Sequence, residues 1–154
     1  LKAVQGGTRV LLELTAGSGT SVGATFENLQ SIIEQIPDDQ QHRLGICFDT
    51  CHAYSAGYDL VNDYDSVWVL FDEVIGLERL GLIHMNDSKH PFESRKDRHE
   101  NIGQGTLGPE PFQRIMLDER LGHVPKILET PKGDEGNTAD IANLDLLRGF
   151  RASA

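Results

Sequence analysis

The chain alternates short apolar runs with amphipathic stretches, and this alternation is the strongest constraint on its fold. Four apolar runs predict buried strands at residues 9–13, 44–48, 80–85 and 126–128. Each run is followed, directly or after a connection, by apolar residues at three- and four-residue spacing, which predicts a helix. Repeated strand–helix units are typical of a parallel sheet covered by helices. We therefore predict an α/β fold with four βα units in one domain, residues 1–154.

The four predicted helices are defined by their apolar positions, and Pro37 ends the first of them. These positions are Phe26, Leu29, Ile32, Ile33 and Ile36, then Val67, Leu70, Phe71, Val74 and Ile75, then Phe112, Ile115 and Met116, and last Ile141, Leu144, Leu147 and Phe150. Between the second strand and its helix we expect a loop of small and polar residues. A connection of more than twenty residues without apolar periodicity follows the third strand and ends near Pro109. Connections that long are usually functional or mobile.

Four βα units make half of an eight-stranded (β/α) TIM-type barrel, which takes about 250 residues. An open, Rossmann-like sheet of four or five strands is the alternative. Residues 1–7 begin with Leu rather than Met and read like the end of an earlier helix. We therefore expect the chain to begin partway through a longer protein and to form the C-terminal four βα units of a barrel.

Composition narrows the possible functions. The chain has 14 Lys and Arg against 24 Asp and Glu, a net charge of −10, which argues against capture of nucleic acid by charge alone. No apolar run approaches the ~18 to 20 residues that span a bilayer, so we expect a cytoplasmic protein without membrane contact. Two cysteines, Cys47 and Cys51, exclude a disulfide framework and a cysteine-rich zinc site. Any metal must then use histidines and carboxylates.

Potential metal ligands stand at or near the C-terminal ends of all four predicted strands. They are Glu13, Asp49, His84 and Glu129. In a (β/α) barrel this rim carries the active site, so four strands would direct their ligands to one place. Any one of these residues alone could simply be where a strand meets solvent, but four of four predict a site.

Two short pairs extend the set: Asp49 with His52, and Asp97 with His99. Imidazole nitrogens and carboxylate oxygens are ligands that zinc and manganese accept. Three histidines and four carboxylates are more than one four-coordinate ion uses, so they predict a cluster of at least two metals.

Five segments of the chain resemble, in order and spacing, the endonuclease IV family of DNA repair enzymes that act at abasic sites. They are ELTAGSG (13–19), DTCHAYSAGYD (49–59), HMNDSK (84–89), DRHENIGQG (97–105) and LETP (128–131). The resemblance covers nearly the whole chain. It implies a (β/α) barrel that acts as a monomer, binds three Zn²⁺ ions, with Mn²⁺ as an alternative, and hydrolyses double-stranded DNA. The bond cut is the phosphodiester 5′ to an abasic site, which leaves a 3′-hydroxyl.

The resemblance also implies roles for single residues. Glu13 resembles the carboxylate that bridges two zincs, and Glu13 and Glu129 are the candidate catalytic residues. Partners of the second zinc are Asp49, His84 and Glu129, and ligands of the third are His52, Asp97 and His99. The family's first zinc takes two histidines that have no counterpart in this chain, and we expect them upstream of Leu1. Leu14 stands where the family usually has Asn.

DNA contacts are expected from two loops that flank these ligands. They involve Gly17, Ser18 and Gly19 in the first loop, and Lys89, Arg95 and Arg98 in the long connection. An ordinary solvated loop of mixed charge remains the alternative for the second. We expect His42, His90 and His123 to be surface residues, and Cys51 and Trp68 to serve packing.

Two other functions stay open. One is a metal-dependent sugar isomerase or epimerase of the xylose-isomerase-like barrels, which needs one or two metals and a base rather than a third ion. The other is an inactive fragment, because a half barrel leaves its sheet edges without partners. The block Asp97-Arg98-His99 favours the endonuclease.

Overall fold

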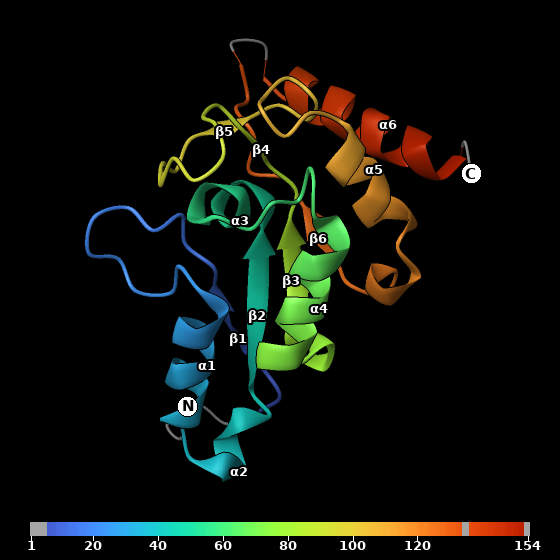
Figure 1. Cartoon of the computed structure of the whole chain (residues 1–154). Coiled ribbons are helices and arrows are strands. Elements are labelled where there is room, and N and C mark those ends of the chain that lie inside the picture. The colour runs from blue at the N-terminus through green and yellow to red at the C-terminus, as the bar shows by residue number, and fades with distance from the viewer. Residues whose placement is uncertain (1–5, 134–135, 153–154) are drawn as a thin grey trace.

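Residues 6–133 and 136–152 are described by the computed structural model of the chain. Their centre is a four-stranded parallel sheet with the order β1-β2-β3-β6 (Figure 1). The strands are β1 (Val10–Glu13), β2 (Leu44–Asp49), β3 (Leu80–His84) and β6 (Lys126–Ile127). Each bound lies within one residue of the sequence prediction. The strands lie side by side in chain order, as in a (β/α) barrel, and the order does not reverse as it does in a Rossmann-like sheet. The structure therefore favours the half barrel over the Rossmann-like alternative.

Helices and 3-10 turns connect the strands. They are α1 (Phe26–Glu34), α2 (Asp38–Gln41), α3 (Thr50–Ala56), α4 (Tyr64–Val74), η1 (Leu77–Arg79), α5 (Glu110–Leu117), η2 (Glu119–Leu121) and α6 (Thr138–Ala152). The helices expected after each strand are confirmed as α1, α4, α5 and α6. Not every expected apolar position is covered, because Leu70, Ile141 and Leu144 are exposed.

Helices α1 and α4 pack on the same face of the sheet. The ring of Phe48 on β2 lies 6.3 Å from that of Phe26 on α1 and 4.6 Å from that of Trp68 on α4. Phe71 joins the cluster edge-on to Phe26, and all four side chains are fully buried. Since Trp68 lies in this cluster, it serves packing as expected. The core therefore fixes β2, the strand whose end carries Asp49.

The opposite face of the sheet carries the candidate ligands, because side chains alternate along a strand. Glu13 pairs in register with Cys47, and Asp49 pairs with His84. On the same face, below the ligands, the side chain of Leu11 packs against Gly45 and Gly81. A Cβ atom at either glycine would collide with it. Two glycines thus let one leucine lie flat across three strands, underneath the ligands.

The segment after β2 corrects the sequence analysis, which expected a loop there. It forms α3, and residues 50–55 are buried on every side, so the helix has no polar face that periodicity would reveal. The Asp49 carboxylate caps α3 by accepting a hydrogen bond of 2.9 Å from the amide N–H of His52. Gly57 ends the helix in the left-handed conformation.

The long connection after β3 is also more ordered than its sequence indicates. It contains the antiparallel pair β4 (Asp87–Ser88) and β5 (His99–Glu100), which lies beside α3 above the sheet (Figure 1). The buried carboxylate of Asp87 holds it together by accepting hydrogen bonds from four backbone N–H groups, those of Ser88, Gly103, Gly105 and Leu107. This connection places His99 over the strand ends.

Candidate metal centre

Four ligand atoms from four strand ends meet at the sheet's carboxyl edge. The Nδ1 atom of His84 lies 3.2 Å from Glu13 Oε1, 3.6 Å from Asp49 Oδ2 and 3.0 Å from Glu129 Oε2. Each residue offers one ligand atom within 4.8 Å of the other three. His84 and Asp49 are buried, whereas Glu13 and Glu129 reach solvent. We call these four residues the strand-end group.

A second group lies directly beside the first. His52 on α3, and Asp97 and His99 from the long connection, bring their ligand atoms together. The Oδ1 atom of Asp97 is 3.2 Å from His52 Nε2 and 3.5 Å from His99 Nε2. We call these three residues the loop group. The structure therefore brings together all seven metal ligands predicted from sequence, and it places His52 on a helix rather than a loop.

Asp49 and Glu13 connect the two groups. Asp49 Oδ2 lies 3.6 Å from His99 Nε2 as well as 3.6 Å from His84 Nδ1. Glu13 Oε1 is 3.4 Å from His52 Nδ1 and 3.2 Å from His84 Nδ1. A carboxylate between two clusters of ligands is the arrangement that a shared, multinuclear metal site requires.

The close carboxylates and histidines shift one another's protonation. Close contacts with the imidazoles of His52 and His84 lower the pKa of Glu13 to about 2. Burial pulls the pKa of His52 down, but contact with Glu13 and the charges of Asp49 and Asp97 outweigh it and raise the pKa to about 9. Contacts with Asp49, Cys47 and Glu13 raise the pKa of His84 to about 12. Without a metal, the rings of His52 and His84 are therefore protonated on both nitrogens and positively charged at neutral pH.

The arrangement of ligand atoms around His84 fits a divalent metal ion in two respects. The Nδ1 atom of His84 is buried and makes no directed hydrogen bond among the described residues, although three carboxylate oxygens surround it. Ligand atoms on a tetrahedral zinc with bonds of 2.0–2.1 Å lie about 3.3 Å apart, and the distances around His84 Nδ1 range from 3.0 to 3.6 Å. The residues present therefore fit a metal ion.

The comparisons with known proteins agree with this geometry. The family model described as "Xylose isomerase-like TIM barrel" matches residues 2–149. The chain belongs to this TIM-barrel family. A curated relative from Trichlorobacter lovleyi, named "Probable endonuclease 4", is 57% identical over 145 residues, which are 92% of this chain and 50% of the relative. A relative of the same name from Methanosphaera stadtmanae is 51% identical and covers 93% of this chain and 50% of its own length.

A solved structure gives the same result. The crystal structure of endonuclease IV from Thermus thermophilus is 42% identical, with a TM-score of 0.81, over 94% of this chain and 50% of its own. The chain thus spans about half the length of the relatives it matches. The resemblance to endonuclease IV is confirmed, and so is the partial TIM barrel.

The loops expected to contact DNA flank the ligand groups in this TIM-barrel half. Ser18, Lys96 and Arg98 line a hollow of about 380 Å³ together with His90 and Asp97. A second hollow, of about 210 Å³, is lined by Gly17, Gly19 and Arg95 among others. Lys89 lines neither of these two hollows, and its Nζ approaches Glu100 Oε2 at 3.8 Å.

A side-chain hydrogen bond joins the two loops, and a backbone hydrogen bond joins the second loop to α3. The hydroxyl of Ser18 donates to the carbonyl of Arg95, whose own N–H donates to the carbonyl of Ser55 on α3. Arg95 and Glu93 adopt positive φ angles of 53° and 59°. Such backbone is uncommon for residues other than glycine, and it turns this part of the connection toward α3.

Two residues that the sequence analysis did not single out contact the ligands. Asn86 and Thr50 are fully buried and hydrogen-bond to residues of the strand-end group. A signal was available, because Asn86 follows the candidate ligand His84 by two residues. Cys51 packs as expected, and its thiol donates to the carbonyl of Arg98 at 3.7 Å.

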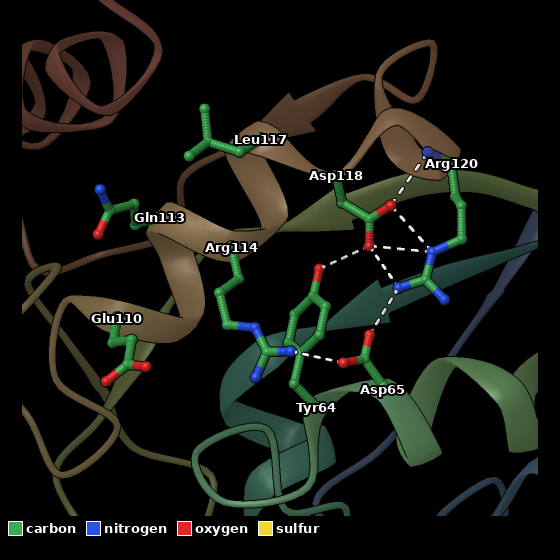
Figure 2. Close-up of a pocket in the computed structure, with 8 residues that line it drawn as sticks. All are labelled: Tyr64, Asp65, Glu110, Gln113, Arg114, Leu117, Asp118 and Arg120. Carbon is green, nitrogen blue, oxygen red and sulfur yellow. Dashed lines mark hydrogen bonds and ion pairs between the residues drawn. The ribbon is translucent and has the colours of Figure 1, made fainter. Parts of the chain in front are cut away.

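A further hollow, of about 450 Å³, lies between α4 and α5 and contains none of the candidate ligands. Figure 2 shows that its arginines pair with Asp65 and Asp118, whereas Glu110 stands apart from them. Arg114 donates to Asp65 at 2.8 Å and lies over the ring of Tyr64, and Arg120 donates to Asp118 and Asp65. Because these cations are already paired with carboxylates, the hollow does not suit an anion. None of the described helices has the length and apolar content needed to cross a membrane.

Proposed function

We propose that the chain is the C-terminal half of a zinc-dependent endonuclease that hydrolyses the phosphodiester 5′ to abasic sites in double-stranded DNA. The product has a 3′-hydroxyl, and the reaction belongs to base excision repair in the cytoplasm. One observation carries the proposal. Seven histidines and carboxylates form two adjoining groups at the strand ends of a half barrel, in a chain whose relatives are named endonuclease 4.

Zinc is the metal that we assign to the two groups. Mixed imidazole and carboxylate ligands at near-tetrahedral spacing suit zinc, and manganese is the alternative. In this assignment Asp49, His84 and Glu129 hold one ion and the loop group holds another. A third ion would share Glu13 with two histidines from outside the chain, so that the complete monomeric enzyme holds three.

Exposure separates the roles of the carboxylates within the strand-end group. Asp49 is fully buried, so it acts only as a ligand. The side chains of Glu13 and Glu129 are 38% and 45% exposed, so within the strand-end group they are the carboxylates that an incoming phosphodiester and a water molecule reach. Asp97 in the loop group is also exposed. We assign Glu13 and Glu129 to orient the attacking water by accepting its hydrogen bonds. Divalent ions, when bound, lower the pKa of water and neutralise charge on the phosphate and the leaving oxygen.

The acidic chain would bind DNA through a local cationic surface and the bound metals. Lys89, Arg95 and Arg98 would contact phosphates, and Gly17, Ser18 and Gly19 would let a backbone approach closely. Three divalent ions add six positive charges at the same edge of the sheet. This compensates locally for the net charge of −10.

The decisive experiment measures metal content and nicking together. The protein is expressed from its natural reading frame, purified and analysed for metals. It is then assayed on a duplex with one abasic site, with and without chelator. About three zincs per chain and chelator-sensitive cleavage support the proposal. One bound ion and no cleavage would instead support a sugar isomerase. The relatives, which are named endonuclease 4, do not point to that activity.

A further inference from the structure

Asn86 stands at the centre of the strand-end group without being one of its ligands. It lies two residues beyond His84, at the end of β3, which is the strand between β2 and β6. Asn86 is fully buried, so its side chain meets neither solvent nor an approaching substrate. A buried carboxamide is costly unless its donor and acceptor are both satisfied.

The carboxamide of Asn86 spans the two neighbouring strand ends. Its Nδ2 donates a hydrogen bond of 2.7 Å to Oδ2 of Asp49, the buried ligand at the end of β2. Its Oδ1 accepts a hydrogen bond of 2.9 Å from the backbone N–H of Glu129, just beyond the end of β6. One planar group therefore fixes the position of one ligand's side chain and the backbone that carries another.

These two partners fix the orientation of the amide. A carboxylate of Asp49 only accepts hydrogen bonds, and the backbone N–H of Glu129 only donates. Of the common side chains of this size, only an amide offers a donor and an acceptor on one rigid plane. Aspartate would keep the acceptor but lose the donor, and leucine would lose both.

Thr50 holds Asn86 in place from below. Its hydroxyl accepts a hydrogen bond of 2.9 Å from the backbone N–H of Asn86 and lies 2.7 Å from the backbone carbonyl oxygen of Asn86. The other oxygen of Asp49 is fixed as well, by the His52 N–H at 2.9 Å. Both oxygens of Asp49 are therefore oriented by hydrogen bonds, and the one that faces His84 and His99 is oriented by Asn86.

We propose that Asn86 is a positioning residue of the metal centre, which aligns Asp49 and Glu129 across β3 so that both meet the same ion. This inference rests on the proposed metal-dependent function. Groups that orient metal ligands by hydrogen bonds typically contribute 10- to 100-fold to metal affinity or activity. Asn86 is placed to do this for two ligands at once.

Asn143 on α6 provides a matched control. It is also buried, and its side chain also makes several hydrogen bonds, with Asn101, Thr130 and the N–H of Ile102. None of these partners is a candidate ligand. Loss of either asparagine removes a buried polar group of equal size, but only Asn86 touches ligand groups.

The test compares Asn86→Ala, Asn86→Asp and Asn143→Ala in the protein expressed from its natural reading frame. Zinc retention is measured by competition with a chelator, and the visible absorption of the cobalt-substituted protein reports ligand geometry. Thermal unfolding of the metal-free proteins shows whether each variant folds. If Asn86→Ala does not fold, the nearly isosteric Asn86→Asp carries the test.

We expect Asn86→Ala and Asn86→Asp to retain zinc at least about tenfold more weakly and to change the cobalt spectrum, while Asn143→Ala alters neither. Equal zinc retention in the Asn86 variants and the unmodified protein would overturn the inference but leave the proposed function intact. So would an equal loss in Asn143→Ala. If the unmodified protein retains no zinc, the proposed function itself fails.

Discussion

His52 and His99 point their Nε2 atoms at each other across 3.4 Å. The opposite nitrogen of each ring is engaged by the backbone: His52 Nδ1 lies 2.9 Å from the carbonyl oxygen of Leu14, and His99 Nδ1 lies 3.1 Å from that of Glu129. A carbonyl only accepts, so each Nδ1 carries the proton, and in the neutral rings both Nε2 lone pairs face one another. A proton or a cation between them relieves this repulsion, and the Asp97 carboxylate is beside them.

Replacing one of these rings tests the loop group as a metal site. We expect His99→Ala to lose about one metal ion per chain and at least about 100-fold in nicking rate, because a direct ligand matters more than its supports. Elemental analysis and the abasic-site assay measure both. His123→Ala removes an exposed histidine outside the two groups and serves as the control. Full metal content in His99→Ala would refute the loop group as a ligand set.

The cationic surface predicts a salt-dependent contribution to DNA binding. Arg98→Ala should weaken binding to an abasic duplex and reduce the slope of log affinity against log salt by about 0.9 for each phosphate that the arginine neutralises. Fluorescence anisotropy at several salt concentrations measures the slope. Arg148→Ala, an exposed arginine on α6 that pairs with Asp145, should leave the slope unchanged. Equal slopes for Arg98→Ala and the unmodified protein would place the DNA elsewhere.

The strands were predictable because each is a short apolar run, and the strand-end ligands followed from their bounds. Helix α3 was not predictable, because it is buried on all sides and lacks a period in hydropathy. The position of Asp97 and His99 over the sheet was not predictable from spacing either. It depends on the hydrogen bonds between Asp87 and four backbone N–H groups, three of them distant in the chain, which no local pattern encodes.

Asn86 was missed for a related reason. A buried asparagine looks like a loop residue in sequence, and its importance comes from two partners 37 and 43 residues away. The endonuclease IV motifs contain it, in HMNDSK, but the resemblance alone attached no role to it. Residues that orient other residues are visible only once the hydrogen bonds are known.

The connection that carries His99 should be sensitive at Gly105. A Cβ atom there would collide with the Asp87 carboxylate and the Ser88 carbonyl. We therefore expect Gly105→Ala to lower stability by about 1–3 kcal/mol and to weaken zinc retention in the loop group. Gly149→Ala, in helix α6 with no atom near its added Cβ, should be neutral or stabilising. Urea unfolding and chelator competition compare the two, and equal behaviour would contradict this role for Gly105.

The histidine protonation states predict how pH affects the metal-free protein. His52 has a pKa of about 9 in the folded state against an ordinary value of 6.5. Its contribution to stability is therefore complete below about pH 6.5 and is lost as pH rises toward 9. The pKa of His84 is raised as well, so it acts in the same direction. Glu13 has a lowered pKa of about 2 against 4.5, so its contribution is lost only in acid.

We therefore expect the free energy of unfolding of the metal-free protein to fall between about pH 6.5 and pH 8.5. This range stays below the ordinary thiol pKa of 9.0, so ionisation of the cysteines does not contribute to the decline. Urea denaturation in the presence of chelator measures it, and His52→Gln should flatten the decline. Zinc requires neutral imidazoles, so its binding should release protons and tighten as pH rises over the same window. A metal-free protein whose stability increases across this range would show that the carboxylates around His52 do not hold its proton.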